Sequence, residues 1–176
     1  MDLQEFQKHA KRTVNWTLSP QIQLANFGLG IAGEAAEIAE ETTYSVESEP
    51  QKSKIIDECG DVCFYVANLC TALIIDWTDL IPPNVELATW NDSDICLDLF
   101  RQAGKIADVI KKTIAQGHEL DIEKLRKSIS GLMEHLKELL RYFDITLEEV
   151  CEYNHLKLLK RYPHGFEVER SIKREN

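Results

Sequence analysis

Apolar residues recur at intervals of three and four along almost the whole chain, and this periodicity limits the folds that the chain can adopt. Leu24, Phe27, Ile31, Ala35 and Ile38 form one such series. A period near 3.6 places these side chains on one face of a helix, whereas a half-buried strand alternates at every second residue. Runs of β-branched residues with that alternation do not occur. The sequence therefore predicts an all-α fold.

Capping residues, glycines and prolines divide this periodic sequence into separate helices. Ser19 and Pro20 fit the cap and the first position of one helix, and Gly117 fits the end of another. Thr146 and Glu149 have the spacing of a capping box, in which each side chain accepts a hydrogen bond from the other residue's backbone. We expect helices at residues 3–16, from 20 to a polar break at 45–49, from 50 to about 76, from the capping residues 91–93 to 116, at 121–142, and from 147 to just before Pro163.

Length and composition favour one compact unit. A chain of 176 residues buries one substantial core. We treat residues 1–176 as a single all-α domain with parts at 1–76, 92–144 and 145–170, and the clear linker lies at 81–84, where two prolines remove backbone donors. No apolar run reaches the roughly 18 residues of a membrane helix, and no basic and apolar leader precedes the first helix. We therefore expect a soluble, cytoplasmic protein without a membrane partner.

The charge of the chain restricts its partners. With 20 basic and 30 acidic residues, the formal net charge is −10. Such a protein repels a nucleic-acid backbone unless its basic residues are concentrated, so we expect no nucleic-acid partner. An anionic substrate would need a divalent cation between itself and the protein.

The five cysteines suggest neither a disulfide framework nor a zinc knuckle, because they lie mostly within apolar helical stretches. Cys59 and Cys63 are four residues apart and would face a shared metal ion or the core. Because no second pair and no nearby histidine accompanies them, we assign them to the core.

The chain resembles itself at an offset of about 70 residues. A shift of 71 aligns Ala32 with Ala103, and a shift of 70 aligns Val62 with Leu132. At these shifts the four acidic positions change: Glu34 aligns with Lys105, Glu37 with Asp108, Glu58 with Ser128, and Asp61 with Gly131. One interpretation is a duplicated helical hairpin whose second copy, at 92–144, lost its carboxylates. The alternative is chance similarity between two amphipathic hairpins.

Two pairs of acidic residues have the same spacing on consecutive helices. Glu34 and Glu37 are three residues apart, as are Glu58 and Asp61, so each pair projects from one face of its helix. If the two helices are antiparallel neighbours, four carboxylates converge. Acids that close repel one another unless a cation that prefers oxygen ligands lies among them, and Mg²⁺ or Mn²⁺ is the simplest candidate.

The alternative is that these acids lie on a solvated helix face, as most charged residues do. Two glycines argue against it. Gly33 and Gly60 each precede an acid, and a glycine inside a helix costs about 1 kcal/mol relative to alanine. We therefore expect close helix approach at both positions.

Three sequence blocks resemble the MazG-like family of all-α nucleoside triphosphate pyrophosphohydrolases. Residues 29–40 and 56–62 match the family's E-x-x-E and E-x-x-D elements, and residues 154–166 are similar to its closing N-x-x-K-L-x-x-R-Y-P-x-G-F. The match covers residues 3–75 and 145–169. The hairpin at 92–144 is the departure, because the closing helix usually follows the second acidic helix directly. The chain would then either imitate within itself the subunit pair of smaller relatives, as a pseudo-dimer, or form a homodimer.

The resemblance implies hydrolysis of a nucleoside triphosphate between its α and β phosphates. It implies Mg²⁺, with Mn²⁺ as the alternative, held by Glu34, Glu37, Glu58 and Asp61, with Glu37 as the catalytic residue that orients the attacking water. The candidate substrate-binding residues are Lys54, Asn154, Lys157, Arg161, Tyr162 and Trp16, with Phe27 as a further aromatic platform for the base. Each of these also has an ordinary alternative as a solvent-facing or core residue. Two other functions stay open: a helical module that binds nucleotide or metal without turnover, and an interaction scaffold.

Overall fold

The computed structural model describes residues 1–43, 49–83 and 92–173, and within these ranges all regular structure is helical. This confirms the all-α prediction. The polar break was expected at 45–49, but α3 begins at Glu49, and residues 45–48 lie outside the described ranges. Asn84 of the linker and the capping side chains expected at 91–93 are also outside the described part of the chain. The elements are α1 (Leu3–Ala10), η1 (Lys11–Thr13), α2 (Pro20–Thr43), α3 (Glu49–Ala72), η2 (Trp77–Leu80), α4 (Asp92–Gln116), α5 (Ile122–Tyr142), α6 (Leu147–Arg161) and α7 (Val168–Ile172).

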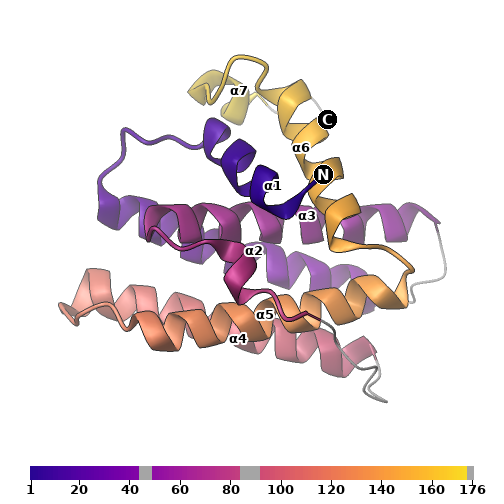
Figure 1. The fold of residues 1–176 in the computed structure, drawn as a ribbon, viewed down its shortest axis with the longest axis horizontal. Coiled ribbons are helices and arrows are strands. Elements are labelled where there is room, and N and C mark those ends of the chain that lie inside the picture. Colours follow the sequence, from indigo (N-terminus) through magenta and orange to yellow (C-terminus); the bar gives the residue numbers. More distant parts are fainter. Residues whose placement is uncertain (44–48, 84–91, 174–176) are drawn as a thin grey trace.

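Two long helical hairpins form the body of the protein (Figure 1). Helices α2 and α3 make the first hairpin, α4 and α5 make the second, and α2 packs against α4. The shorter helices α1 and α6 pack on α3, on the side away from the second hairpin in Figure 1. One continuous core includes side chains from all of these helices, among them Phe6, Phe27, Val62, Leu132 and Val150. This arrangement leaves α3 between α2 and α6.

The two hairpins end in the same kind of turn, at positions 70 residues apart. Ile74 after α3 and Asp144 after α5 both have a left-handed backbone, with φ of 58° and 56°. The next backbone N–H then donates back into the helix, from Ile75 to the Cys70 carbonyl at 2.8 Å and from Ile145 to Leu140 at 3.0 Å. The turn therefore recurs at the sequence offset of the proposed repeat.

The first helix is shorter than the sequence predicted. Instead of reaching residue 16, α1 ends at Ala10, a single 3-10 turn follows, and Val14 is extended. The indole N–H of Trp16 donates to the Lys11 carbonyl at 2.7 Å, and the Arg12 guanidinium donates to the Tyr162 carbonyl at 2.8 Å. These hydrogen bonds take the place of a continued helix. The bond from Arg12 joins this segment to Tyr162, which is 150 residues away in sequence.

The third helix also ends early, at Ala72 rather than near residue 76. Its continuation is a left-handed turn and the short helix η2, in which Asp76 caps by accepting from the Thr78 backbone N–H at 3.0 Å. Trp77 is fully buried there, and its indole N–H donates to the Leu3 carbonyl at 2.7 Å. Burial of this side chain against α1 explains why the chain leaves the helical path.

The later helices agree closely with the prediction. α5 begins after Asp121, whose side chain caps it, and α6 begins with the capping box of Thr146 and Glu149. All five cysteines are buried and free, as expected for core residues. Among the described helices, none is long and apolar enough to cross a membrane.

Candidate functional site

The acids of α2 and α3 come together where the first hairpin faces α6. Glu34, Glu37 and Glu58 each place one carboxylate oxygen within 4.8 Å of the other two. The i,i+3 spacing directs Glu34 and Glu37 to the same side of α2, and the antiparallel packing of α3 brings Glu58 opposite them. The convergence expected from sequence is thus present for three of the four acids.

Two of these carboxylates, Glu34 and Glu58, have raised pKa values. Burial, the neighbouring charges of Asp61 and Glu37, and a hydrogen bond with Glu58 raise the pKa of Glu34 to about 8. Burial also raises the pKa of Glu58, and the nearby Glu37 and Asp61 carboxylates add to that effect. Negative charges held this close repel one another, and either a proton or a cation relieves the repulsion.

The geometry of the three carboxylates fits a small divalent ion. Opposite ligands of Mg²⁺ lie about 4.2 Å apart, twice the usual bond length of about 2.1 Å. The three oxygens lie within 4.8 Å of one another, so small side-chain rotations bring them to ligand distances. All three donors are carboxylate oxygens, which Mg²⁺ and Mn²⁺ prefer. Glu34, Glu37 and Glu58 therefore fit such an ion by donor type and spacing.

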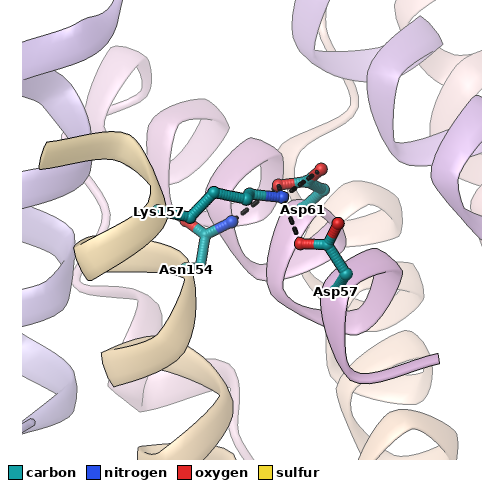
Figure 2. A network of polar contacts seen from close by, with 4 residues as sticks. All are labelled: Asp57, Asp61, Asn154 and Lys157. Atoms are coloured by element: carbon teal, nitrogen blue, oxygen red, sulfur yellow. Dashed lines mark hydrogen bonds and ion pairs between the residues drawn. The ribbon is translucent and has the colours of Figure 1, made fainter. Parts of the chain in front are cut away.

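Asp61 is placed differently from the prediction, because a cation from α6 already binds it (Figure 2). The ammonium group of Lys157 lies 2.7 and 2.8 Å from the two Asp61 oxygens and also donates to Asp57. The amide of Asn154 donates to Asp61 at 2.6 Å. Burial raises the pKa of Asp61, and the Lys157 charge partly offsets that shift. Asp61 thus lies beside the three-carboxylate group, held by two residues of the closing helix.

The same contacts raise the pKa of the Lys157 ammonium group. Burial alone would lower the pKa of its ammonium group, but the carboxylates of Asp61 and Asp57 outweigh burial and raise it. Only 16% of the Lys157 side chain is exposed. The lysine is therefore charged at neutral pH and links α6 to the acidic face of α3.

Gly60 allows this close approach of α3 and α6. A Cβ atom at Gly60 would lie 2.9 Å from the Asn154 Cβ, closer than side-chain carbons normally pack. The prediction of close helix approach is confirmed at this position. It is wrong at Gly33, where a Cβ atom would meet nothing within 4 Å. Gly33 is exposed on α2.

A pocket of about 500 Å³ adjoins the acids. Its walls come from α2, α3, α6 and the segments on either side of them, and its charged lining includes Glu34, Glu37, Glu58, Asp61 and Lys157. Arg161 and Tyr162 line it as the sequence proposed, and Phe27 contributes an aromatic wall. The predicted acids, closing-helix cations and aromatic side chains therefore share one cavity.

Three predicted substrate-binding residues lie apart from this lining. Asn154 is fully buried, and its amide donates to Asp61. The ammonium group of Lys54 is on the surface and pairs with Glu41 at 2.9 Å, and 62% of its side chain is exposed. Trp16 is also exposed and contacts the pocket indirectly, with its ring centroid 6.2 Å from that of Phe27. The helical spacing of Lys54 and Glu58 does not bring both into the pocket, because Lys54 is one turn nearer the start of α3.

Several pocket residues were not singled out from sequence. Asp57 shares Lys157 with Asp61, and its i,i+4 spacing from Asp61 was a usable signal. Gln23 and Asn26 add amide groups from α2, and Phe64 and Tyr65 add aromatic rings from α3. Their positions follow from helix packing, so the sequence offered no comparable signal for them.

Comparison of the chain with protein-family models gave no match. Comparisons with curated proteins and with solved structures gave no match either. The site is therefore described by its own residues: three clustered carboxylates, a fourth bound by Lys157 and Asn154, and a pocket with aromatic walls.

Proposed function

We propose that the protein is a Mg²⁺-dependent nucleoside triphosphate pyrophosphohydrolase with a MazG-like helical bundle. The observation that carries this proposal is the meeting of Glu34, Glu37 and Glu58 within 4.8 Å in a pocket that also contains Lys157 and Arg161. Carboxylates suited to a divalent ion lie next to cationic side chains suited to phosphate. A triphosphate needs both, because its charge must be neutralised and its chain held in one orientation.

Each residue has a specific task in this proposal. Glu34, Glu37 and Glu58 hold the ion, and Asp61, itself held by Asn154, positions Lys157 at the pocket wall for the bound phosphates. When bound, Mg²⁺ neutralises charge on the phosphate oxygens and favours ionisation of the attacking water. The exposed carboxylate of Glu37 orients that water toward the α phosphorus. Water adds across the bond between the α and β phosphates and yields a nucleoside monophosphate and pyrophosphate.

The other end of the substrate meets the aromatic part of the pocket. Phe27 and Tyr162 line the cavity, and Tyr162 packs beside Phe166 with ring centroids 5.8 Å apart. A planar base binds well against such faces, and the amides of Gln23 and Asn26 supply hydrogen bonds. The substrate is therefore oriented with its phosphates at α3 and α6 and its base toward α2.

The test is release of pyrophosphate from a panel of ribo- and deoxyribonucleoside triphosphates with Mg²⁺. We expect turnover by the wild type, loss of at least about 100-fold in Glu58→Ala, and retention in Glu40→Ala, which removes an exposed acid of the same hairpin. Equal rates in wild type and Glu58→Ala would remove the site assignment.

A second candidate is a nucleotide-binding module without turnover. The observation that favours it is the ion pair of Asp61 with Lys157, which neutralises one of the four predicted metal ligands. Calorimetry that shows Mg²⁺-dependent nucleotide binding, with no pyrophosphate formed from any triphosphate, would support this function over the hydrolase.

A further inference from the structure

A second pocket, of about 590 Å³, lies on the α4–α5 hairpin and has a different chemical character. Its lining includes Gln102 and Lys105 from α4 and Lys124, Lys127, Ser130 and Glu134 from α5. Three ammonium groups thus border one concavity together with a single carboxylate. The acid-lined pocket on the first hairpin has the reverse balance, with more carboxylates than cations.

The two pockets occupy corresponding places on the two hairpins. At the offsets of 71 and 70 residues, Lys105 corresponds to Glu34 and Lys127 corresponds to Asp57. Ser128 and Gly131, which also line the second pocket, correspond to Glu58 and Asp61. The shared left-handed turn at Ile74 and Asp144 supports this alignment independently of the side chains. The second hairpin therefore presents lysines at the positions of Glu34 and Asp57, and uncharged residues at those of Glu58 and Asp61.

The lining of the second pocket has a net positive charge, with three lysines and one glutamate. Within residues 1–43, 49–83 and 92–173, Lys105, Lys124 and Lys127 form no ion pair, and Lys105 reaches only the Gln102 side-chain oxygen at 3.4 Å. Asp108, which corresponds to Glu37, does not line the pocket. Its carboxylate is bound by Lys111 at 2.8 Å and by Lys112 at 2.7 Å.

We propose that this pocket binds a small phosphate-bearing anion without a metal ion. Lysine ammonium groups are point-charge donors that suit phosphate oxygens, and a concave arrangement of several raises the local concentration of anions. Ser130 and Gln102 supply uncharged donors beside them. The volume accommodates pyrophosphate or a phosphorylated metabolite, whereas the net charge of −10 opposes a long nucleic-acid backbone.

The test uses the full chain in EDTA at physiological ionic strength, with inorganic pyrophosphate as the probe. Without a metal ion, the acidic pocket repels this anion, so the measurement reports on the lysine pocket and does not depend on the proposed hydrolysis. We expect saturable binding by calorimetry and shifts of the Ser130 and Gly131 amide signals in NMR spectra. The double variant Lys105→Gln/Lys127→Gln should raise the Kd at least about tenfold, because two charge-assisted contacts are lost.

Control variants show whether pyrophosphate binding depends on the lysine pocket. Lys160→Gln removes an exposed lysine of α6 outside the pocket, and Glu58→Gln alters the acidic pocket; both should bind pyrophosphate as the wild type does. Because Lys105 and Lys127 are exposed, the double variant should keep its helical circular dichroism. Absence of saturable binding, an equal loss in Lys160→Gln, or tighter binding of a single-stranded oligonucleotide than of pyrophosphate would overturn the proposal.

Discussion

Lys157 on α6 and Asp61 on α3 form an ion pair in which the ammonium group lies 2.7 and 2.8 Å from the two carboxylate oxygens, although 96 residues separate them in sequence. The same ammonium group also contacts Asp57. A single side chain of the closing helix therefore binds two acids at the edge of the candidate metal site.

Replacement of Lys157 should destabilise the fold. Lys157→Met leaves Asp57 and Asp61 without their cation in a partly buried setting, and we expect a loss of roughly 1–3 kcal/mol in the free energy of unfolding. Urea denaturation measures it. Lys160→Met, on the exposed side of the same helix, should change stability by less than about 0.5 kcal/mol. A Lys157→Met protein as stable as the control would show that the ion pair adds no stability.

Two glycine replacements should have opposite effects. Gly60→Ala places a methyl group 2.9 Å from the Asn154 Cβ, so α6 must shift, and we expect a loss of about 1–3 kcal/mol. Gly33→Ala meets open space inside a helix and should gain roughly 0.5–1 kcal/mol. Thermal unfolding of both variants checks the prediction. A stable Gly60→Ala protein would contradict the tight α3–α6 contact.

The raised pKa of Glu34 predicts a pH-dependent stability in metal-free protein. Its ordinary value is 4.5, and the folded value is about 8, so between these values the folded chain binds a proton that the unfolded chain releases. Stability is therefore highest at the acidic end of this window and falls as pH rises through it. After allowance for partial exposure, we expect Glu34 to account for about 1–2 kcal/mol of that fall.

The measurement is urea denaturation in EDTA at several pH values across this window. Glu34→Gln should flatten the decline, because a neutral amide cannot lose a proton. Glu40→Gln, which removes an exposed acid of α2, should keep the wild-type slope. Identical slopes in wild type and Glu34→Gln would show that the Glu34 carboxyl is ordinary.

The positions of the cationic residues predict different effects on substrate binding, if the protein hydrolyses nucleoside triphosphates as proposed. Arg161 lines the pocket, and Arg161→Ala should raise KM about tenfold by removing a phosphate contact. Lys54 pairs with Glu41 on the surface, and Lys54→Ala should change KM less than about twofold. Steady-state kinetics compare the two. A large effect at Lys54 alone would mean that the substrate extends beyond the pocket.

Local sequence signals predicted the helices well wherever local contacts decide the structure. The capping box at Thr146 and the cap at Asp121 set the starts of α6 and α5, and both form hydrogen bonds with nearby backbone. The end of α1 was predicted too late, because Arg12 contacts Tyr162 across 150 residues. Apolar periodicity contains no information about such a distant partner.

The same distinction applies to the candidate site. The i,i+3 spacing of Glu34 and Glu37 fixes their common face, and the pairing of adjacent helices brings Glu58 to them. The binding of Asp61 by Lys157 depends instead on how α6 crosses α3, which Gly60 permits. The sequence could therefore indicate which acids are paired on each helix, but not which acid would be bound by lysine.

The central claim, that the clustered carboxylates hold a divalent ion, is tested most directly by Mn²⁺ titration followed by electron paramagnetic resonance of the free ion. The account predicts saturable Mn²⁺ binding that Mg²⁺ displaces, that Glu58→Gln weakens at least about tenfold, and that Glu40→Gln leaves unchanged. Wild-type binding no tighter than that of Glu58→Gln would contradict it.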